Sequence, residues 1–327
     1  MLVLTHSQVR ELLPMRECMD VVAEALGDLA RGEGSQPLRS EIVLPDRRGV
    51  LAWMPGSLAS GKPFGVKILS VLDNAAKMGL DSHQGGVMIF DPDTGSPLAL
   101  LEAGAITAVR TAAVSALATE RLARTNTTTL AILGAGTQAR SHIEAMLEVR
   151  PFERIRVWSR DSETVARFVE ELAARHDVLF ESAADVRSAV AGADVICTTT
   201  SARKPILLGE MLDPGMHINA VGASVPSWRE IDPGVVPLVA LFTDRRESLQ
   251  NEAGEYIEAV EEGLITSGLV VPELGEVLNR DHPGRTSETE ITLFRSLGLA
   301  VEDIAAGQMV YERALERGIG TRVDLAG

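Results

Sequence analysis

The chain has 327 residues, a hydrophobic content of 45% and a formal net charge of −15. This composition is typical of folded globular proteins, and the length favours two domains. Because so acidic a surface repels phosphate groups, nucleic acids and anionic membranes are excluded as favoured partners.

Cysteine usage indicates a reducing compartment. Cys18 and Cys197 are the two cysteines of the chain, and neither stands in a CxxC pair or a Cys/His cluster. A disulfide framework and a structural zinc site are therefore not expected. The first residues lack a basic stretch followed by an apolar run, and apolar runs such as 235–242 are too short to cross a bilayer. These features predict a cytoplasmic protein.

The N-terminal third predicts a mixed or antiparallel sheet. Residues 4–30 indicate a strand followed by a helix that begins at Pro14. Short β-like runs follow at residues 40–44, 49–54, 64–71 and 86–90, separated by Gly, Pro, Asp and Asn. The turn sequence at 91–95 predicts a hairpin between 87–90 and 97–101.

Strands and helices alternate after a long Ala-rich helix predicted for residues 107–123. Strands are expected at 129–133, 155–158, 178–180, 194–199, 217–221 and 239–243, with helices ending near 149 and spanning 162–175 and 186–190. This alternation predicts a doubly wound parallel sheet of the Rossmann type. A last helix at about 300–317 is expected to return to the first domain.

A phosphate-binding motif follows the first strand of this sheet. It has the form GxGxxA and runs through Gly134, Ala135, Gly136, Thr137 and Gln138 to Ala139. Gly134 allows a tight turn, Gly136 allows close approach of a pyrophosphate, and Ala139 allows the helix to pack on the strand. Because the helix N-terminus also presents N–H groups and a positive dipole end, the motif predicts a dinucleotide site.

The end of the second strand distinguishes between dinucleotides. An NAD enzyme normally places an acidic residue there to bind the ribose 2′-hydroxyl. This chain has Ser159 and Arg160, and the guanidinium of Arg160 is suited to a 2′-phosphate. Asp161 is the competing ribose ligand if the strand ends two residues later. We therefore expect NADPH as the cofactor, with NADH as the less favoured alternative.

Three basic residues of the first domain each stand isolated within an apolar or β-like run: Arg39, Lys67 and Arg110. Arg39 and Lys67 alternate with apolar neighbours, and Arg110 lies within an Ala-rich helix. A charge in so apolar a setting is either at a helix edge or buried for a purpose. For each residue taken alone, an ordinary surface position is the favoured interpretation.

Several longer motifs resemble one family. They are Ser82-His83-Gln84, the stretch beginning at Arg110-Thr-Ala-Ala, the run from Gly192 through Lys204 to His217-Ile-Asn-Ala-Val-Gly-Ala-Ser224, and Leu293-Phe-Arg-Ser-Leu-Gly through Asp303. Together with the glycine motif they span nearly the whole chain. The chain thus resembles the ornithine cyclodeaminase/mu-crystallin family.

The resemblance implies a homodimer in which substrate and dinucleotide bind to different domains of the chain. Residues 1–114 and 303–327 would form a substrate-binding and dimerisation domain, and residues 115–302 the Rossmann domain. Arg39, Lys67 and Arg110 match the family's substrate-carboxylate residues. Ser82, His83 and Gln84 match positions near the nicotinamide, and Thr198, Thr199, Val221 and Ser296 match the lining of the cofactor cleft.

One position separates the two branches of the family. Cyclodeaminases carry a proton-handling aspartate where this chain has Ser224, so Ser224 favours the mu-crystallin branch, which reduces cyclic ketimines. The implied reaction is NADPH-dependent reduction of a C=N bond in a small amino-acid-derived carboxylate. Arg39 and Arg110 would bind the carboxylate over the nicotinamide, and Lys67 is the candidate acid. Neighbouring guanidinium groups and burial would lower the pKa of Lys67, while the substrate carboxylate would oppose that shift.

Other functions remain open at this point. An amino-acid dehydrogenase would use the same carboxylate site and hydride, a cyclodeaminase would release ammonia from ornithine or lysine, and a non-catalytic protein would only bind NADPH. The scattered histidines show no metal-ligand spacing, so no metal is expected. The glutamates between 252 and 262 suggest a solvated helix face, and Arg229 with Glu230 suggests a local ion pair.

Overall fold

The computed structural model describes residues 1–72, 78 and 83–325. Contacts divide the chain into two compact units, unit 1 being residues 1–113 with 299–327 and unit 2 being residues 114–298. The sequence predicted divisions at 114/115 and 302/303. Helix α3, Ala103–Leu122, contains the first division.

Unit 1 is built on a seven-stranded mixed sheet. Its strand order is β14-β1-β6-β5-β4-β3-β2, with β1 parallel to β6 and the other pairs antiparallel. The strands are β1 Leu2–Leu4, β2 Ser40–Val43, β3 Gly49–Ser57, β4 Phe64–Leu72, β5 His83–Phe90, β6 Pro97–Glu102 and β14 Thr321–Arg322. The helices are α1 His6–Leu12, α2 Met15–Ala30 and α10 Ala300–Arg317. The expected mixed sheet is confirmed.

The predicted β5–β6 hairpin is also confirmed, and its turn shows why. The carboxylate of Asp91 accepts hydrogen bonds from the backbone N–H groups of Asp93 and Thr94, at 3.1 and 2.8 Å. Gly95 then adopts a φ of +68°, in the left-handed region that favours glycine. The helix predicted to begin at Pro14 is confirmed as α2, whose N-cap is Pro14. The short helix α1 between β1 and Pro14 was not predicted.

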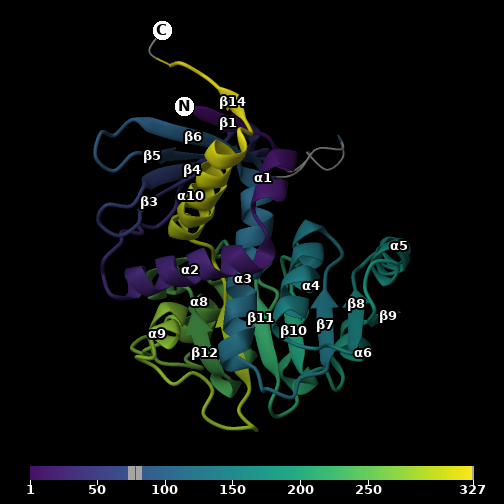
Figure 1. The fold of residues 1–327 in the computed structure, drawn as a ribbon. Coiled ribbons are helices and arrows are strands. Elements are labelled where there is room, and N and C mark those ends of the chain that lie inside the picture. Colours follow the sequence, from purple (N-terminus) through teal and green to yellow (C-terminus); the bar gives the residue numbers. More distant parts are fainter. Residues whose placement is uncertain (73–77, 79–82, 326–327) are drawn as a thin grey trace. The chain divides into compact units, whose positions relative to one another are not determined.

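Helix α10 covers one face of this sheet, lying along β3 to β6 (Figure 1). The side chains that face it include Leu69, Val87, Ile89 and Leu101, all buried. The helix packs closely on the sheet at Gly307, where a Cβ would lie 3.4 Å from Leu101 and 3.5 Å from Ile89. The C-terminal helix therefore completes the core of a sheet formed by the first hundred residues.

Unit 2 contains the predicted doubly wound sheet, and all its strand pairs are parallel. The order is β12-β13-β11-β10-β7-β8-β9. The strands are β7 Thr129–Leu133, β8 Arg154–Trp158, β9 Leu179–Ser182, β10 Val195–Thr198, β11 His217–Ala220, β12 Ala240–Thr243 and β13 Thr292–Arg295. The helices are α4 Thr137–Val149, α5 Ser162–Ala173, α6 Val186–Val190, α7 Arg246–Glu252, α8 Gly254–Glu261 and α9 Leu274–Leu278.

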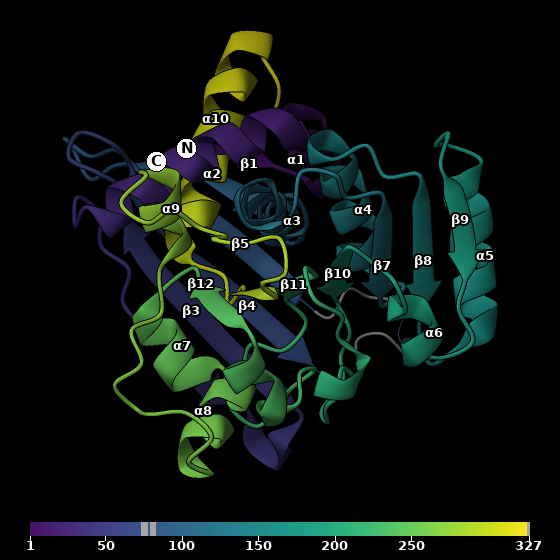
Figure 2. The ribbon, with the colours of Figure 1, turned by 90° about the horizontal axis from the view of Figure 1, so that it is seen from below.

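Helices cover both faces of this sheet. Figure 2 shows α4 and α6 on either side of the row of strands. Ala131 and Leu133 of β7 pack with Val190 of α6, and alternation along the strand turns Leu130 and Ile132 to the other face. Strand β13 lies between β11 and β12, a position that the sequence did not indicate.

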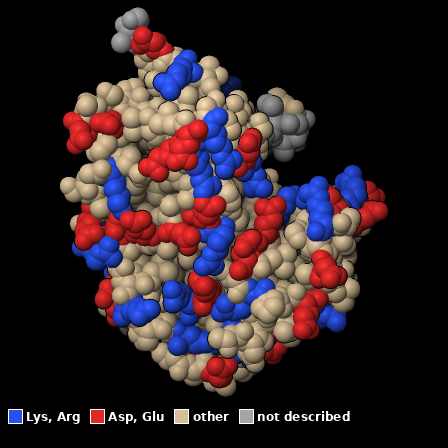
Figure 3. Space-filling model, viewed as in Figure 1, with Lys and Arg blue, Asp and Glu red and all other residues tan. Residues whose placement is uncertain are grey.

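Acidic and basic side chains are intermingled on the face seen in Figure 3, so the negative charge there is not one continuous patch. Within the described residues no helix is both long and apolar enough to traverse a bilayer.

Candidate active site

The glycine loop of unit 2 has the geometry that the motif predicted. It connects β7 to α4, and Gly134 adopts a φ of +127°. A Cβ at Gly134 would lie 2.7 Å from both the carbonyl and the hydroxyl oxygen of Thr199, so no side chain fits there. Gly136 is the N-cap of α4, and a Cβ at this position would meet open space. The open backbone at Gly136 and the exposed first turn of α4 at Thr137 suit a phosphate group.

The three residues that follow β8 differ in exposure and in hydrogen bonding. Ser159 is half-buried and Arg160 is exposed, directly after the strand ends at Trp158. Asp161 is the N-cap of α5, and its carboxylate accepts hydrogen bonds from Thr164 Oγ1 and from the N–H of Glu163. The hydrogen bond from Thr164 is the largest cause that lowers the pKa of Asp161. The carboxylate of Asp161 is thus engaged in capping its helix.

Glu230 joins the loops that follow β10 and β11. This buried carboxylate accepts hydrogen bonds from Thr198 Oγ1 at 2.7 Å, Thr200 N–H at 2.6 Å and Gly222 N–H at 2.6 Å. Burial raises the pKa of Glu230, and these donors oppose the shift. The ion pair predicted between Glu230 and Arg229 is wrong, because Arg229 pairs with Glu258 of α8.

The side chain of Arg295 fixes the end of β11 and the loop after it by binding their backbone carbonyl oxygens. This buried side chain donates to the carbonyl oxygens of Ala220 and Ala223, which precede Ser224, and pairs with Glu255. The acidic run was predicted to be a solvated face, but Glu252 and Glu255 are buried. The reason is that α7 and α8 turn these two residues inward, whereas Glu261 and Glu262 remain exposed.

The predicted cleft residues of unit 2 thus gather at the carboxyl ends of its parallel strands, where open α/β sheets bind ligands. Thr198, Val221 and Ser296 are buried, and Thr199 and Ser224 are half-buried. Thr199 Oγ1 donates to the carbonyl oxygen of Leu133, which connects the loop after β10 to the glycine loop.

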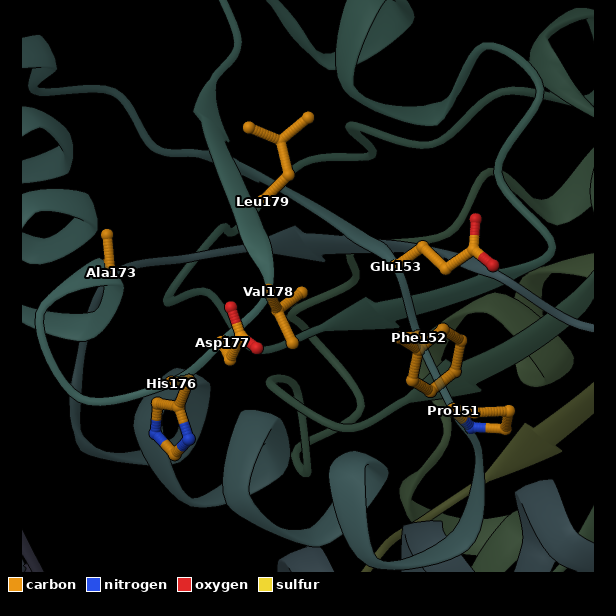
Figure 4. Close-up of a pocket in the computed structure, with 8 residues that line it drawn as sticks. All are labelled: Pro151, Phe152, Glu153, Ala173, His176, Asp177, Val178 and Leu179. Carbon is orange, nitrogen blue, oxygen red and sulfur yellow. The ribbon is translucent and has the colours of Figure 1, made fainter.

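A surface hollow of about 650 Å³ lies elsewhere in unit 2 (Figure 4). It is lined by Pro151, Phe152, Glu153, Ala173, His176, Asp177, Val178 and Leu179. These residues precede β8 and β9, at the amino ends of the strands, so the hollow is not part of the dinucleotide site. Across the described part of the chain, His, Cys, Asp and Glu form no group of three or more suited to a metal ion.

The basic residues of unit 1 form a buried ionic cluster around α10. Lys67 Nζ lies 3.0 Å from Asp303 Oδ1, and Arg110 Nε lies 2.9 Å from the same oxygen. Arg110 Nη1 also lies 2.6 Å from Glu302 Oε2. Lys67 is 1% exposed and Arg110 4%, so water does not screen these charges appreciably. The sequence placed neither acidic residue in the site, although two adjacent acids in the first turn of an apolar helix were a visible signal.

The cluster shifts the ionisation of its members. Burial lowers the pKa of Lys67 to about 8, Arg110 and Arg39 lower it as well, and Asp303 opposes them. Burial also disfavours the charged form of Arg110, but Asp303 and Glu302 outweigh it and raise the pKa of that guanidinium. Lys67 therefore exchanges a proton near neutral pH, while Arg110 remains a permanent cation.

The remaining predicted residues lie near this sheet. Arg39 is half-buried just before β2. His83 begins β5, and Gln84 is exposed opposite Ser70 of β4. Ser82 lies outside the described residues.

Comparisons with known proteins agree with this arrangement. The sequence profile of the ornithine cyclodeaminase/mu-crystallin family matches residues 1–318. The ketimine reductase mu-crystallin of Mus musculus is 40% identical over 291 residues, covering 88% of this chain and 89% of the mouse protein. The solved Δ1-pyrroline-2-carboxylate reductase of Thermococcus litoralis, in complex with NADH and L-proline, is 36% identical with a TM-score of 0.95, covering 99% of this chain and 100% of its own. An archaeal alanine dehydrogenase dimer with bound NAD is 30% identical with a TM-score of 0.93, covering 99% of both chains.

The fold and these likenesses define a class: two-unit α/β proteins related to dinucleotide-linked reductases and dehydrogenases. Within that class, the chain belongs to the ornithine cyclodeaminase/mu-crystallin family.

The two glycines of the loop are expected to respond differently to alanine. Gly134→Ala combines an unfavourable φ with a contact against Thr199 and should lower the free energy of unfolding by about 2–4 kcal/mol. Gly136→Ala is the matched control and should cost about 1 kcal/mol or less, because its Cβ meets open space. Urea unfolding of both variants measures the difference, and equal costs would contradict the described loop.

Proposed function

We propose that the protein reduces the C=N bond of a small, cyclic ketimine carboxylate to the corresponding amino acid, using NADPH. The observation that carries the proposal is the buried pairing of Lys67 with Arg110 and Asp303, which combines a proton donor with a permanent cation. The relatives from mouse and Thermococcus litoralis, a ketimine reductase and a Δ1-pyrroline-2-carboxylate reductase, support it. Unit 1 would bind the substrate and unit 2 the dinucleotide.

The residues would divide the reaction as follows. Arg110 and Arg39 together bind the substrate carboxylate. Arg110 does so through Nη2, because its Nε already donates to Asp303 and its Nη1 to Glu302. When bound, the dinucleotide supplies the hydride to the imine carbon. Lys67 donates a proton to the imine nitrogen, which makes the carbon a better hydride acceptor, and it regains a proton from solvent afterwards. With a pKa of about 8, Lys67 is mostly protonated at pH 7.

Replacing Lys67 by methionine tests the reaction. Lys67→Met keeps the apolar stem but removes the proton, so kcat should fall by at least about 100-fold, while NADPH still binds to unit 2. The assay follows NADPH oxidation with pyrroline-2-carboxylate and piperideine-2-carboxylate, with NADPH binding measured by fluorescence. Near-parental turnover in the variant would exclude Lys67 as the acid.

The same assay separates the alternative functions. The archaeal alanine dehydrogenase relative favours an amino-acid dehydrogenase as the second candidate, which would oxidise NADPH with pyruvate and ammonia. A cyclodeaminase would release ammonia from ornithine or lysine without net change in the dinucleotide, and Ser224 weighs against it. A protein that only binds NADPH would bind it saturably and turn over none of these substrates.

The choice of NADPH rests on the residues after β8. Arg160 is exposed there, and Asp161 is engaged as the cap of α5. Arg160→Ala should raise the KM for NADPH by about 10- to 100-fold, the worth of one charge-assisted hydrogen bond, and leave the KM for NADH nearly unchanged. Arg167→Ala, which removes another exposed arginine of α5, is the control. Parallel changes for both dinucleotides would contradict a contact with the 2′-phosphate.

We also propose a homodimer formed through the second face of the unit 1 sheet, the face opposite α10. Strand register places Ile42 beside Leu51, Trp53 beside Ile68, and Phe64 beside Phe90 on this face. Ile42 is 53% exposed and Ile68 45%, which is unusual for apolar side chains grouped on one sheet. The dimer named for the archaeal alanine dehydrogenase supports a second copy as the occupant.

A charge on this face should break the dimer. Ile68→Glu buries a carboxylate against apolar groups if the face is an interface, so light scattering after gel filtration should give the monomer mass. Leu179→Glu introduces the same charge at a 51% exposed residue of unit 2 and should leave the dimer intact. A parent protein that is itself a monomer would refute the proposal.

A further inference from the structure

Asp303 occupies the centre of the ionic cluster of unit 1. Its Oδ1 contacts both Lys67 Nζ and Arg110 Nε, at 3.0 and 2.9 Å. Asp303 is 0% exposed, and its Oδ2 is buried without a hydrogen bond from the described residues. The neighbouring Glu302 contacts Arg110 at 2.6 Å. The two adjacent acids therefore differ, since Asp303 contacts both cations.

The position of Asp303 stabilises two buried cations that would otherwise repel each other. Two cations held close together in a buried site repel each other, and burial alone favours the neutral form of the lysine. A carboxylate placed between the two cations attracts each of them, and this attraction offsets their mutual repulsion. Asp303 lies in the first turn of α10, which begins at Ala300, and this end of a helix favours negative charge.

We propose that Asp303 is the positioning residue of the reduction, which holds Lys67 in its protonated form and fixes its ammonium group beside Arg110, whereas Glu302 contacts Arg110. This inference rests on the proposed function for its kinetic consequence, but its electrostatic content concerns Lys67 alone. Asp303 acts through Lys67 and has no role of its own in binding the dinucleotide.

The charged groups around Lys67 make the prediction specific. Its strand neighbours Met54 of β3 and Val87 of β5 are apolar. Arg110 of α3 and Arg39 lower its pKa, and Asp303 of α10 raises it. Cys18 of α2 also faces the cluster, but burial raises the pKa of its thiol, so it is neutral near pH 8.

Removing the charge of Asp303 leaves influences on Lys67 that all lower its pKa. In Asp303→Asn the pKa of Lys67 should therefore fall from about 8 by roughly 1 to 3 units, the usual effect of losing one close opposite charge. Glu302→Gln is the matched control, since it removes the adjacent buried carboxylate, which contacts Arg110. It should leave the pKa of Lys67 within about half a unit of the parent value.

Nuclear magnetic resonance reads this pKa without any assay of activity. The lysines of the chain are Lys62, Lys67, Lys77 and Lys204, so protein labelled with ¹³C at lysine Cε gives few signals. Lys67→Met assigns the signal of Lys67, and a pH titration then gives its pKa in each variant. A pKa in Asp303→Asn equal to that of the parent overturns the inference. Asp303→Ser serves as a second neutral variant if the asparagine variant does not fold.

Kinetics test the consequence for the reaction. Because the acid must be protonated, kcat/KM should fall above the pKa of Lys67, and this alkaline limb should move to lower pH in Asp303→Asn. At pH 8 the loss in kcat/KM should be at least about fivefold, and it should be smaller at pH 6. Glu302→Gln should raise KM and keep the limb in place, and Asp303→Glu should restore the limb by restoring the charge. An alkaline limb at the same pH in all variants contradicts the role of Asp303.

The two proposals fail separately. If Asp303→Asn lowers the pKa of Lys67 but the parent reduces no imine, the function is wrong and the positioning of Lys67 stands. If the parent reduces ketimines and the pKa of Lys67 does not depend on Asp303, the function stands and this inference is refuted.

Discussion

The buried contact between Lys67, Arg110 and Asp303 constrains the organisation of the whole chain. Burying a lysine and an arginine costs several kcal/mol unless carboxylates accompany them. Those carboxylates lie on α10, 236 residues from Lys67 along the sequence. The C-terminal helix must therefore return to the N-terminal sheet, and the dinucleotide-type domain is inserted between the two parts of unit 1. The return of α10 thus both completes the apolar core of the unit 1 sheet and neutralises its buried cations.

Local sequence patterns predicted most of the secondary structure and the glycine loop. Alternating strands and helices, the turn at Asp91 and the positions of Gly134 and Gly136 depend on residues close in sequence, and the structure confirms them. Contacts between residues far apart in the sequence could not be predicted from local patterns. Nothing near Lys67 indicates Asp303, and nothing in Glu252 or Glu255 reveals that these glutamates are buried.

Strand β13 illustrates a second limit. Thr292, Leu293 and Phe294 have the composition of a buried strand, but the run is short and ends in Arg295. A charged residue at the end of a four-residue run argues against a central strand when only sequence is considered. The structure resolves this conflict through backbone carbonyls, because Arg295 donates to Ala220 at the end of β11 and to Ala223 of the loop that follows. Its charge is used to fix a loop and is balanced by Glu255.

Arg295 and Glu230 show how unit 2 fixes loops that must stay open to a ligand. Each is a buried charged group that binds backbone atoms of the segments following β10 or β11, and neither projects into the space beside Gly136. Loops fixed in this way keep their shape without apolar packing on the side where a ligand would lie.

Unit 1 uses buried charge differently, since there the protonation state of a buried group, Lys67, is adjustable. The pKa of Lys67 stays near 8 because burial and two arginines lower it while one aspartate raises it. A substrate carboxylate added to that cluster would raise it further by the same Coulombic effect, so substrate binding would itself favour the protonated lysine that reduction needs.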